Sequence, residues 1–126
     1  LEEFKMARAT CDGPIRIRRG ATVAQATSGA TGVTIHAPAG QITMNAASLA
    51  AGAEATFTVT NSFCNVASVP VVALQAVGTG LPQVYVSAVA NGSFNITMTN
   101  LDAATADTTA DVINFIVFNG SNAERG

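Results

Sequence analysis

The chain has 126 residues with a formal net charge of −2, and 48% of them are hydrophobic. Only 11% are charged, against about a quarter in average domains. This length suits one domain with a modest core, and the high apolar content excludes an intrinsically disordered chain. No apolar run reaches the roughly 18 residues of a membrane-spanning helix, and the charged start does not resemble a secretion signal, so we expect no membrane contact.

Positive charge is confined to the two ends of the sequence. Five of the six cations lie in the first nineteen residues, the sixth is Arg125, and the body from Gly20 to Ala123 contains none. Five cations and three acids give the leading segment +2, whereas four acids give the body −4. Because soluble domains usually mix both signs of charge, this division indicates an attachment segment joined to a neutral module. We divide the chain into a basic N-terminal arm and linker (1–32), a folded domain (33–119) and a C-terminal tail (120–126).

Within the arm, Ile15–Arg18 alternates apolar and cationic side chains, as a strand does when it is added to the sheet edge of a partner. The arm residues expected to dock are Lys5, Arg8, Ile15, Arg16, Ile17, Arg18 and Arg19. Contacts with nucleic acid phosphates are the other interpretation. Three acids dilute the positive charge and only Phe4 could stack on a base, so we favour a protein partner. The next segment, Ala21–Gly32, is rich in small residues and has no period, which predicts a linker.

From Val33 onward, short apolar or alternating stretches are separated by turn residues. We predict strands at Val33–His36, Gln41–Met44, Ala55–Thr60, Val69–Gln75, Gln83–Ala90, Ser93–Asn100 and Asp111–Asn119. The clearest alternation is in Ala55–Thr60, Val69–Gln75 reads as a central strand, and Asn91-Gly92 is a strong hairpin signal. Evidence for helices is thin, because Ala46–Ala55 has no amphipathic stripe. The pattern predicts an all-β fold, an antiparallel β-sandwich or small jelly roll with an extended N-terminal arm.

The last predicted strand is apolar on both faces. Ile113, Phe115 and Val117 share one face, and the opposite face carries Val112, Ile116 and Phe118. Two interpretations remain open for this second face: it is a contact between subunits, or loops of the same chain cover it. If it is a contact, Val112, Ile116 and Phe118 form the subunit interface.

Catalytic chemistry finds little support in the sequence. His36 is the only histidine and lies in no nucleophile motif, so a structural or surface role is favoured over a catalytic one. Asp102, Asp107 and Asp111 share one loop, for which a weak calcium site is the alternative to a solvated acidic loop. Their spacing matches no EF-hand loop. We expect no catalytic residue, no metal and no cofactor.

The two cysteines, Cys11 and Cys64, are too few for a disulfide scaffold. We interpret them as free thiols, and a bridge that fastens the arm to the domain is the alternative.

Four stretches of the body resemble a small β-domain of tailed-phage and prophage structural proteins. They are Gln41–Gly52 with its TMNAA turn, Thr56–Ser62, Val86–Thr97 and Val112–Val117. The resemblance spans roughly 33–119, leaves the arm unmatched and includes no catalytic motif. Such domains occur on virions as capsid decorations, head fibres or parts of tail fibres. They are commonly trimeric and are not enzymes.

The resemblance implies a bacteriophage structural protein on the virion surface. We expect a homotrimeric capsid decoration or head-fibre module whose arm anchors it to the major capsid protein or another virion protein. The alternative is a receptor-binding or adhesive module of a phage tail or fibre, in which the loops Gly78–Gln83 and Leu101–Ala110 touch a host molecule. A shell-forming coat protein ranks third because the body lacks a basic interior face, and an enzyme ranks last.

Overall fold

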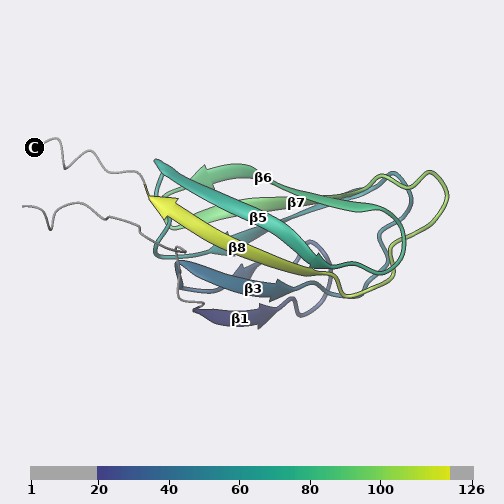
Figure 1. Cartoon of the computed structure of the whole chain (residues 1–126), viewed down its shortest axis with the longest axis horizontal. Helices are drawn as coiled ribbons and strands as arrows, with labels where there is room; N and C mark the ends of the chain where they lie inside the picture. The colour runs from purple at the N-terminus through teal and green to yellow at the C-terminus, as the bar shows by residue number, and fades with distance from the viewer. Residues whose placement is uncertain (1–19, 120–126) are drawn as a thin grey trace, which may run out of the picture.

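A computed structural model describes residues 20–119 and shows two four-stranded β-sheets packed face to face (Figure 1). The strands are β1 (Ala21–Ala24), β2 (Val33–Thr34), β3 (Ala39–Thr43), β4 (Glu54–Thr60), β5 (Ser68–Ala76), β6 (Pro82–Ala90), β7 (Ser93–Asn100) and β8 (Val112–Asn119). The strand order is β1-β3-β8-β5 in the first sheet and β2-β4-β7-β6 in the second. None of the described residues forms a helix. The predicted all-β sandwich is confirmed.

The first sheet begins earlier than the sequence predicts. Ala21–Ala24 forms β1 and pairs in parallel with β3, and β2 pairs in parallel with β4, whereas the other strand pairs are antiparallel. After β1, the buried side chain of Gln25 donates hydrogen bonds to the carbonyls of Gly29 and Thr31 and accepts one from the Asn45 amide. The prediction that Ala21–Gly32 is a linker is therefore wrong, and so is the prediction that the sandwich starts at residue 33.

The core follows the period of two that β-strands impose. In β4 and β7 the inward side chains are fully buried, and they are Phe57, Val59, Phe94, Ile96 and Met98. The inward side chains of β8, Ile113, Phe115 and Val117, face them from the first sheet. The alternation predicted for Ala55–Thr60 and for the last strand is confirmed. Truncation of any one of these large side chains would leave a cavity, which typically lowers the free energy of unfolding by ~2–5 kcal/mol.

The predicted hairpin at Asn91-Gly92 joins β6 to β7. Gly92 has a φ of +85°, a conformation that only glycine adopts without strain, while no non-glycine residue in the described chain has positive φ. A type I′ turn needs positive φ at both central residues, so this hairpin uses a different turn.

Both long edge strands carry features that discourage pairing with another sheet. Pro70 lies in β5 and Pro82 begins β6, and each strand contains a register shift, at Gln75 and at Ser87. Proline removes an edge N–H group, and a bulge twists the edge away from a flat partner. The sequence reading of Val69–Gln75 as a central strand is wrong, because β5 lies at the edge and β8 lies in the middle.

The strands alternate in direction along the chain, so the connections separate into two sets (Figure 1). The connections that follow β1, β3, β5 and β7 lie at one end of the sandwich, which we call the distal end. The first and last described residues, Gly20 and Asn119, lie at the other end, which we call the terminal end. Gly20 hydrogen-bonds there to Ala39, and Asn119 pairs with Ser68.

Candidate functional site

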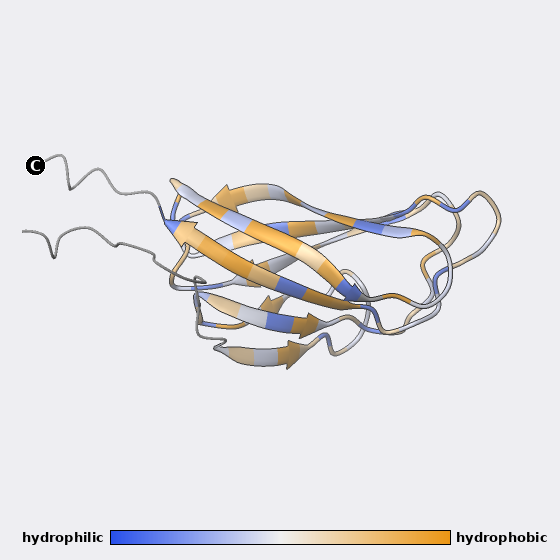
Figure 2. Cartoon of the chain, viewed as in Figure 1, coloured by the Kyte–Doolittle hydropathy of each residue, from blue (hydrophilic) through white to orange (hydrophobic). Residues whose placement is uncertain are grey.

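The outer surface of β5 and β8 is apolar near the terminal end. In the antiparallel register Val69 lies opposite Phe118 and Val71 lies opposite Ile116. Val69 is 59% exposed and Phe118 is 49% exposed. Figure 2 shows the hydrophobic colouring that runs over both strands. We call these four residues the apolar face.

A cluster of amides bounds the apolar face toward the distal end. The side chain of Gln41 in β3 donates to Gln75 in β5 at 2.6 Å and to Asn114 in β8 at 3.2 Å. Asn114 in turn donates to Gln75 at 2.9 Å. The amides bind one another across three strands, so the apolar face has a defined polar border.

The outer surface of the second sheet has a different chemistry. The hydroxyl of Thr97 in β7 lies 2.8 Å from that of Thr56 in β4 and donates to Ser87 in β6 at 2.8 Å. Thr58 donates to Asn95 at 2.9 Å. Hydroxyl and amide groups are prominent on this sheet, which also exposes Tyr85 in β6, whereas the first sheet exposes valine and phenylalanine. The outer surfaces of the two sheets therefore differ in chemistry.

Only two of the three interface residues predicted from the sequence lie together. Ile116 and Phe118 lie together on the apolar face, while Val112 shares their side of β8 but lies beyond Asn114, toward the distal end. Among the described residues, no loop covers Phe118, which is half exposed. Sequence reasoning missed Val69 and Val71. The arm residues Lys5, Arg8, Ile15, Arg16, Ile17, Arg18 and Arg19 lie outside the described residues.

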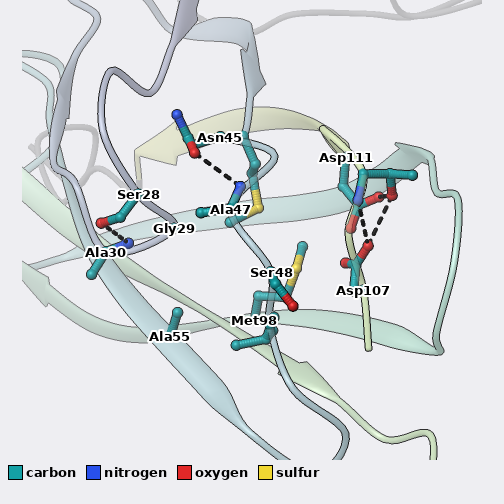
Figure 3. A pocket seen from close by; sticks show the side chains of 13 residues that line it. Ser28, Gly29, Ala30, Asn45, Ala47, Ser48, Ala55, Met98, Asp107 and Asp111 are labelled. Atoms are coloured by element: carbon teal, nitrogen blue, oxygen red, sulfur yellow. Dashed lines mark hydrogen bonds between the residues drawn. The ribbon is translucent and has the colours of Figure 1, made fainter. Parts of the chain in front are cut away.

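A cavity of about 200 Å³ lies at the distal end, and Figure 3 shows the side chains around it. We call it the distal pocket. The β1–β2 and β3–β4 connections, β4, β7 and the β7–β8 loop supply its lining. Met44, Leu49 and Met98 give it apolar walls, and Asp107 and Asp111 give it an acidic side.

The two aspartates of the distal pocket are almost fully buried, with Asp107 3% and Asp111 1% exposed. The hydroxyl of Thr109 lies between them, 2.8 Å from Oδ1 of Asp107 and 3.0 Å from Oδ1 of Asp111. Oδ2 of Asp111 has no hydrogen-bond partner among the described residues. Burial, followed by the hydrogen-bonding contact and the charge of Asp107, raises the pKa of Asp111 to about 7.

The third acid of this loop, Asp102, lies apart from the pair. Its Oδ1 accepts hydrogen bonds from the backbone amides of Ala104 at 2.8 Å and Thr105 at 2.7 Å. These bonds favour the ionised form and lower the pKa of Asp102. Among the described residues, no three His, Cys, Asp or Glu side chains come together as a metal site would require.

The two remaining candidate side chains, His36 and Cys64, contact backbone groups. His36 is exposed at the terminal end, where its Nδ1 accepts a hydrogen bond from the Ser62 amide at 3.0 Å. Cys64 is buried, 4% exposed, forms no disulfide within residues 20–119, and its sulfur contacts the Ser93 carbonyl at 3.4 Å. Neither side chain lines the distal pocket.

No family model, curated protein or solved structure matches this chain. The described part of the chain contains no helix long and apolar enough to cross a membrane.

Proposed function

We propose that this protein is a virion structural protein, a capsid decoration or head-fibre module that its N-terminal arm anchors to the capsid shell. One observation carries the proposal: the arm joins the sandwich at Gly20, at the same end as the apolar face. The arm that attaches the protein and the face that binds other copies of the chain therefore lie at the same end of the sandwich. The loops of the distal end project away from it. The partner of the arm is the major capsid protein or another virion protein.

Self-association through the apolar face supports the same function. Val69 is 59% exposed and Phe118 is 49% exposed, and burying apolar surface contributes roughly 25 cal/mol per Å². The body carries no lysine or arginine, so a copy of the chain brings no cationic side chain of its body into this contact. We propose that copies of the chain associate here as a trimer, with the second sheet facing outward.

Support for a non-enzymatic role comes from the side chains that could carry catalysis. His36 uses Nδ1 to hold a backbone amide, and Cys64 is buried against a carbonyl. The two buried aspartates contact a threonine that joins them, and no histidine or cysteine lines the distal pocket with them.

Capsid binding tests the proposal. Capsids are purified from a phage or prophage that encodes the chain, after deletion of its gene, and the purified protein is added back. The wild-type protein is expected to co-sediment with these capsids. Combined replacement of Arg16, Arg18 and Arg19 by Glu should abolish binding, whereas Arg125→Glu, a charge change outside the arm, should leave it intact. Equal binding of the two variants would contradict anchoring by the arm.

A receptor-binding or adhesive module is the second candidate. The β5–β6 and β7–β8 connections meet at the distal end, where the Thr79 hydroxyl accepts a hydrogen bond from the Thr108 amide at 2.9 Å. Loops that project away from an attachment site are a common place for recognition. Under this candidate, binding of the purified protein to host cells survives the arm variant and is lost when Thr79 and Thr108 are replaced by Lys.

A further inference from the structure

We propose that Asp111, Thr109 and Asp107 form a proton-holding hydrogen-bond chain that keeps the β7–β8 loop closed on the distal pocket and loosens when the proton leaves. The inference concerns the folded domain alone and does not depend on the proposed function. It rests on the geometry of three side chains and on the charges that surround them.

The Thr109 hydroxyl has one proton but two carboxyl neighbours. It lies 2.8 Å from Oδ1 of Asp107 and 3.0 Å from Oδ1 of Asp111, and both distances are those of hydrogen bonds. A hydroxyl has one proton, so two full hydrogen bonds form if one carboxyl donates a proton to the hydroxyl oxygen and the hydroxyl donates to the other carboxyl. A proton held by the pair satisfies both contacts, and this is the step that we infer.

The proton belongs on Asp111. Oδ1 of Asp107 also accepts the Thr109 backbone amide at 3.2 Å, so it already has two donors among the described groups. Oδ2 of Asp111 is buried without a partner, which is tolerable for the carbonyl oxygen of a neutral acid and costly for a carboxylate. The chain then runs from the Asp111 hydroxyl to Thr109, and from the Thr109 hydroxyl to Asp107. The raised pKa of Asp111 agrees with this order.

Among residues 20–119, no other charged side chain lines the pocket beside the pair. The segments around the distal pocket contribute Ser28, Gly29 and Ala30 from the β1–β2 connection, Met44, Asn45, Ala47, Ser48 and Leu49 from the β3–β4 connection, Ala55 from β4 and Met98 from β7. None of these side chains titrates, and the nearby β5–β6 turn contributes the backbone amide of Gly78. The body contains no lysine or arginine. A proton is therefore the available neutralising charge.

Asp107 and Asp111 lie where their charge affects the packing of the β7–β8 loop. The backbone of Asp107 pairs with Leu49 through bonds of 2.8 and 2.9 Å, and the carbonyl of Asp111 accepts the Met44 amide at 2.8 Å. Both aspartates thus hold the β7–β8 loop against the β3–β4 connection. When the proton leaves Asp111, the pair carries one more negative charge inside the protein, and exposure of the loop to water relieves the repulsion between the two carboxylates.

The direction of the pH dependence follows from the proton balance. The folded state holds the Asp111 proton up to about pH 7, whereas the unfolded chain releases it near its ordinary pKa of 3.8. The folded state binds more protons between these values, so stability falls as the pH rises from about 4 to 7 and then levels off. Asp102 changes stability in the opposite direction, because its pKa is lowered in the folded state. Its contribution to stability is therefore lost in acid.

The test measures the melting temperature from pH 4 to pH 9, and amide hydrogen exchange of residues 101–111 corrected for the intrinsic pH dependence of exchange. Wild-type protein should melt roughly 5 °C or more lower at pH 8 than at pH 5, with faster corrected exchange in the loop. Asp111→Asn provides a neutral side chain whose amide can donate to Thr109. This variant should lose most of the pH dependence and melt higher than wild type at pH 8. Asp102→Asn, in the same loop, should keep the wild-type fall in melting temperature between pH 5 and pH 8, because the contribution of Asp102 changes only in acid.

Two results would overturn the proposal. One is a melting temperature of the wild-type protein that rises from pH 5 to pH 8, or a profile that Asp111→Asn leaves unchanged. The other is a metal effect: if 1 mM Ca²⁺ raises the melting temperature of the wild-type protein at pH 8, and Asp111→Asn abolishes that rise, then a metal ion rather than a proton neutralises the pair. An unchanged melting temperature with Ca²⁺ and with EDTA supports the proton.

Discussion

The rings of Phe94 and Phe115 lie 5.7 Å apart with an interplanar angle of 58°, and this contact joins the two sheets. Phe94 comes from β7 in the second sheet and Phe115 from β8 in the first, and both are fully buried. Tilted aromatic pairs of this kind contribute ~0.5–1.5 kcal/mol beyond the area that they bury. The same strand, β8, presents Phe118 to the outside, so one strand serves the core and the apolar face.

Replacement of Phe115 by Ala should lower the free energy of unfolding by about 3–5 kcal/mol, because it removes this contact and leaves a cavity between the sheets. Urea unfolding followed by circular dichroism measures the change. Phe118→Ala is the matched control: the same substitution on the exposed side of β8 should cost less than ~1 kcal/mol, when both proteins are compared as monomers. Similar losses for the two variants would contradict the assignment of the two faces.

Asn100 is the main polar link at the distal end, and it is fully buried. Its amide nitrogen donates to the carbonyls of Leu49 and Thr105, at 3.1 and 2.9 Å, and its oxygen accepts the amides of Leu81 and Asp102. These bonds tie together the β3–β4, β5–β6 and β7–β8 connections.

Asn100→Asp should therefore destabilise the protein by at least ~3 kcal/mol at pH 7, because a buried carboxylate would face carbonyl oxygens. The loss should shrink at pH 4, where the new carboxyl can carry a proton. Asn95→Asp is the control, since its oxygen accepts the Thr58 hydroxyl and a carboxylate keeps that bond. Urea unfolding at both pH values compares the variants, and an equal effect of the two would count against the role of Asn100.

Gly40 in β3 has no room for a side chain. A Cβ atom there would lie 2.8 Å from Cδ1 of Ile35, 2.9 Å from the Ala21 carbonyl oxygen and 2.9 Å from Cε1 of Phe115. Gly40→Ala should cost about 1–3 kcal/mol through overpacking. At Gly29 the added carbon would make an ordinary contact of 3.6 Å with Ala55, so Gly29→Ala should change stability much less. Thermal melts of the two variants should differ, and identical melts would contradict this packing.

Cys64 should be protected in the folded protein, because it is 4% exposed. In a Cys11→Ser variant, Cys64 is the one remaining thiol, and its reaction with Ellman's reagent should be slow in buffer and fast in urea. A second variant with Ser62→Cys added gives the control, since Ser62 is exposed and the new thiol should react at once. Fast reaction of Cys64 in buffer would show that the β4–β5 loop opens readily.

Local alternation was enough to predict the fold class and the two faces of β8. Ile116 and Phe118 could be assigned to the outer side because a strand turns successive side chains in opposite directions. Val69 and Val71 could not be added to them, since their position beside β8 depends on pairing between distant strands. That pairing also decides that β5 is an edge strand.

Two further features left no local pattern in the sequence. In β1, only Val23 packs against the core. The strand forms through its parallel pairing with β3. Asp107 and Asp111 resemble solvated loop acids in the sequence, and their burial arises only when the β3–β4 connection packs against their loop. The sequence therefore predicts a solvated loop or a weak metal site for these acids, and it does not indicate the threonine that contacts both of them.

The native mass of the protein tests the account most directly. Light scattering is applied to the full chain, to the chain without residues 1–19, and to a Phe118→Asp variant, with Thr58→Asp on the second sheet as the matched control. We predict three times the 12.7 kDa chain mass for the full chain and the control, a trimer of the shortened chain, and a monomer for Phe118→Asp. Monomers throughout, or a trimer that survives Phe118→Asp, would contradict assembly through the apolar face.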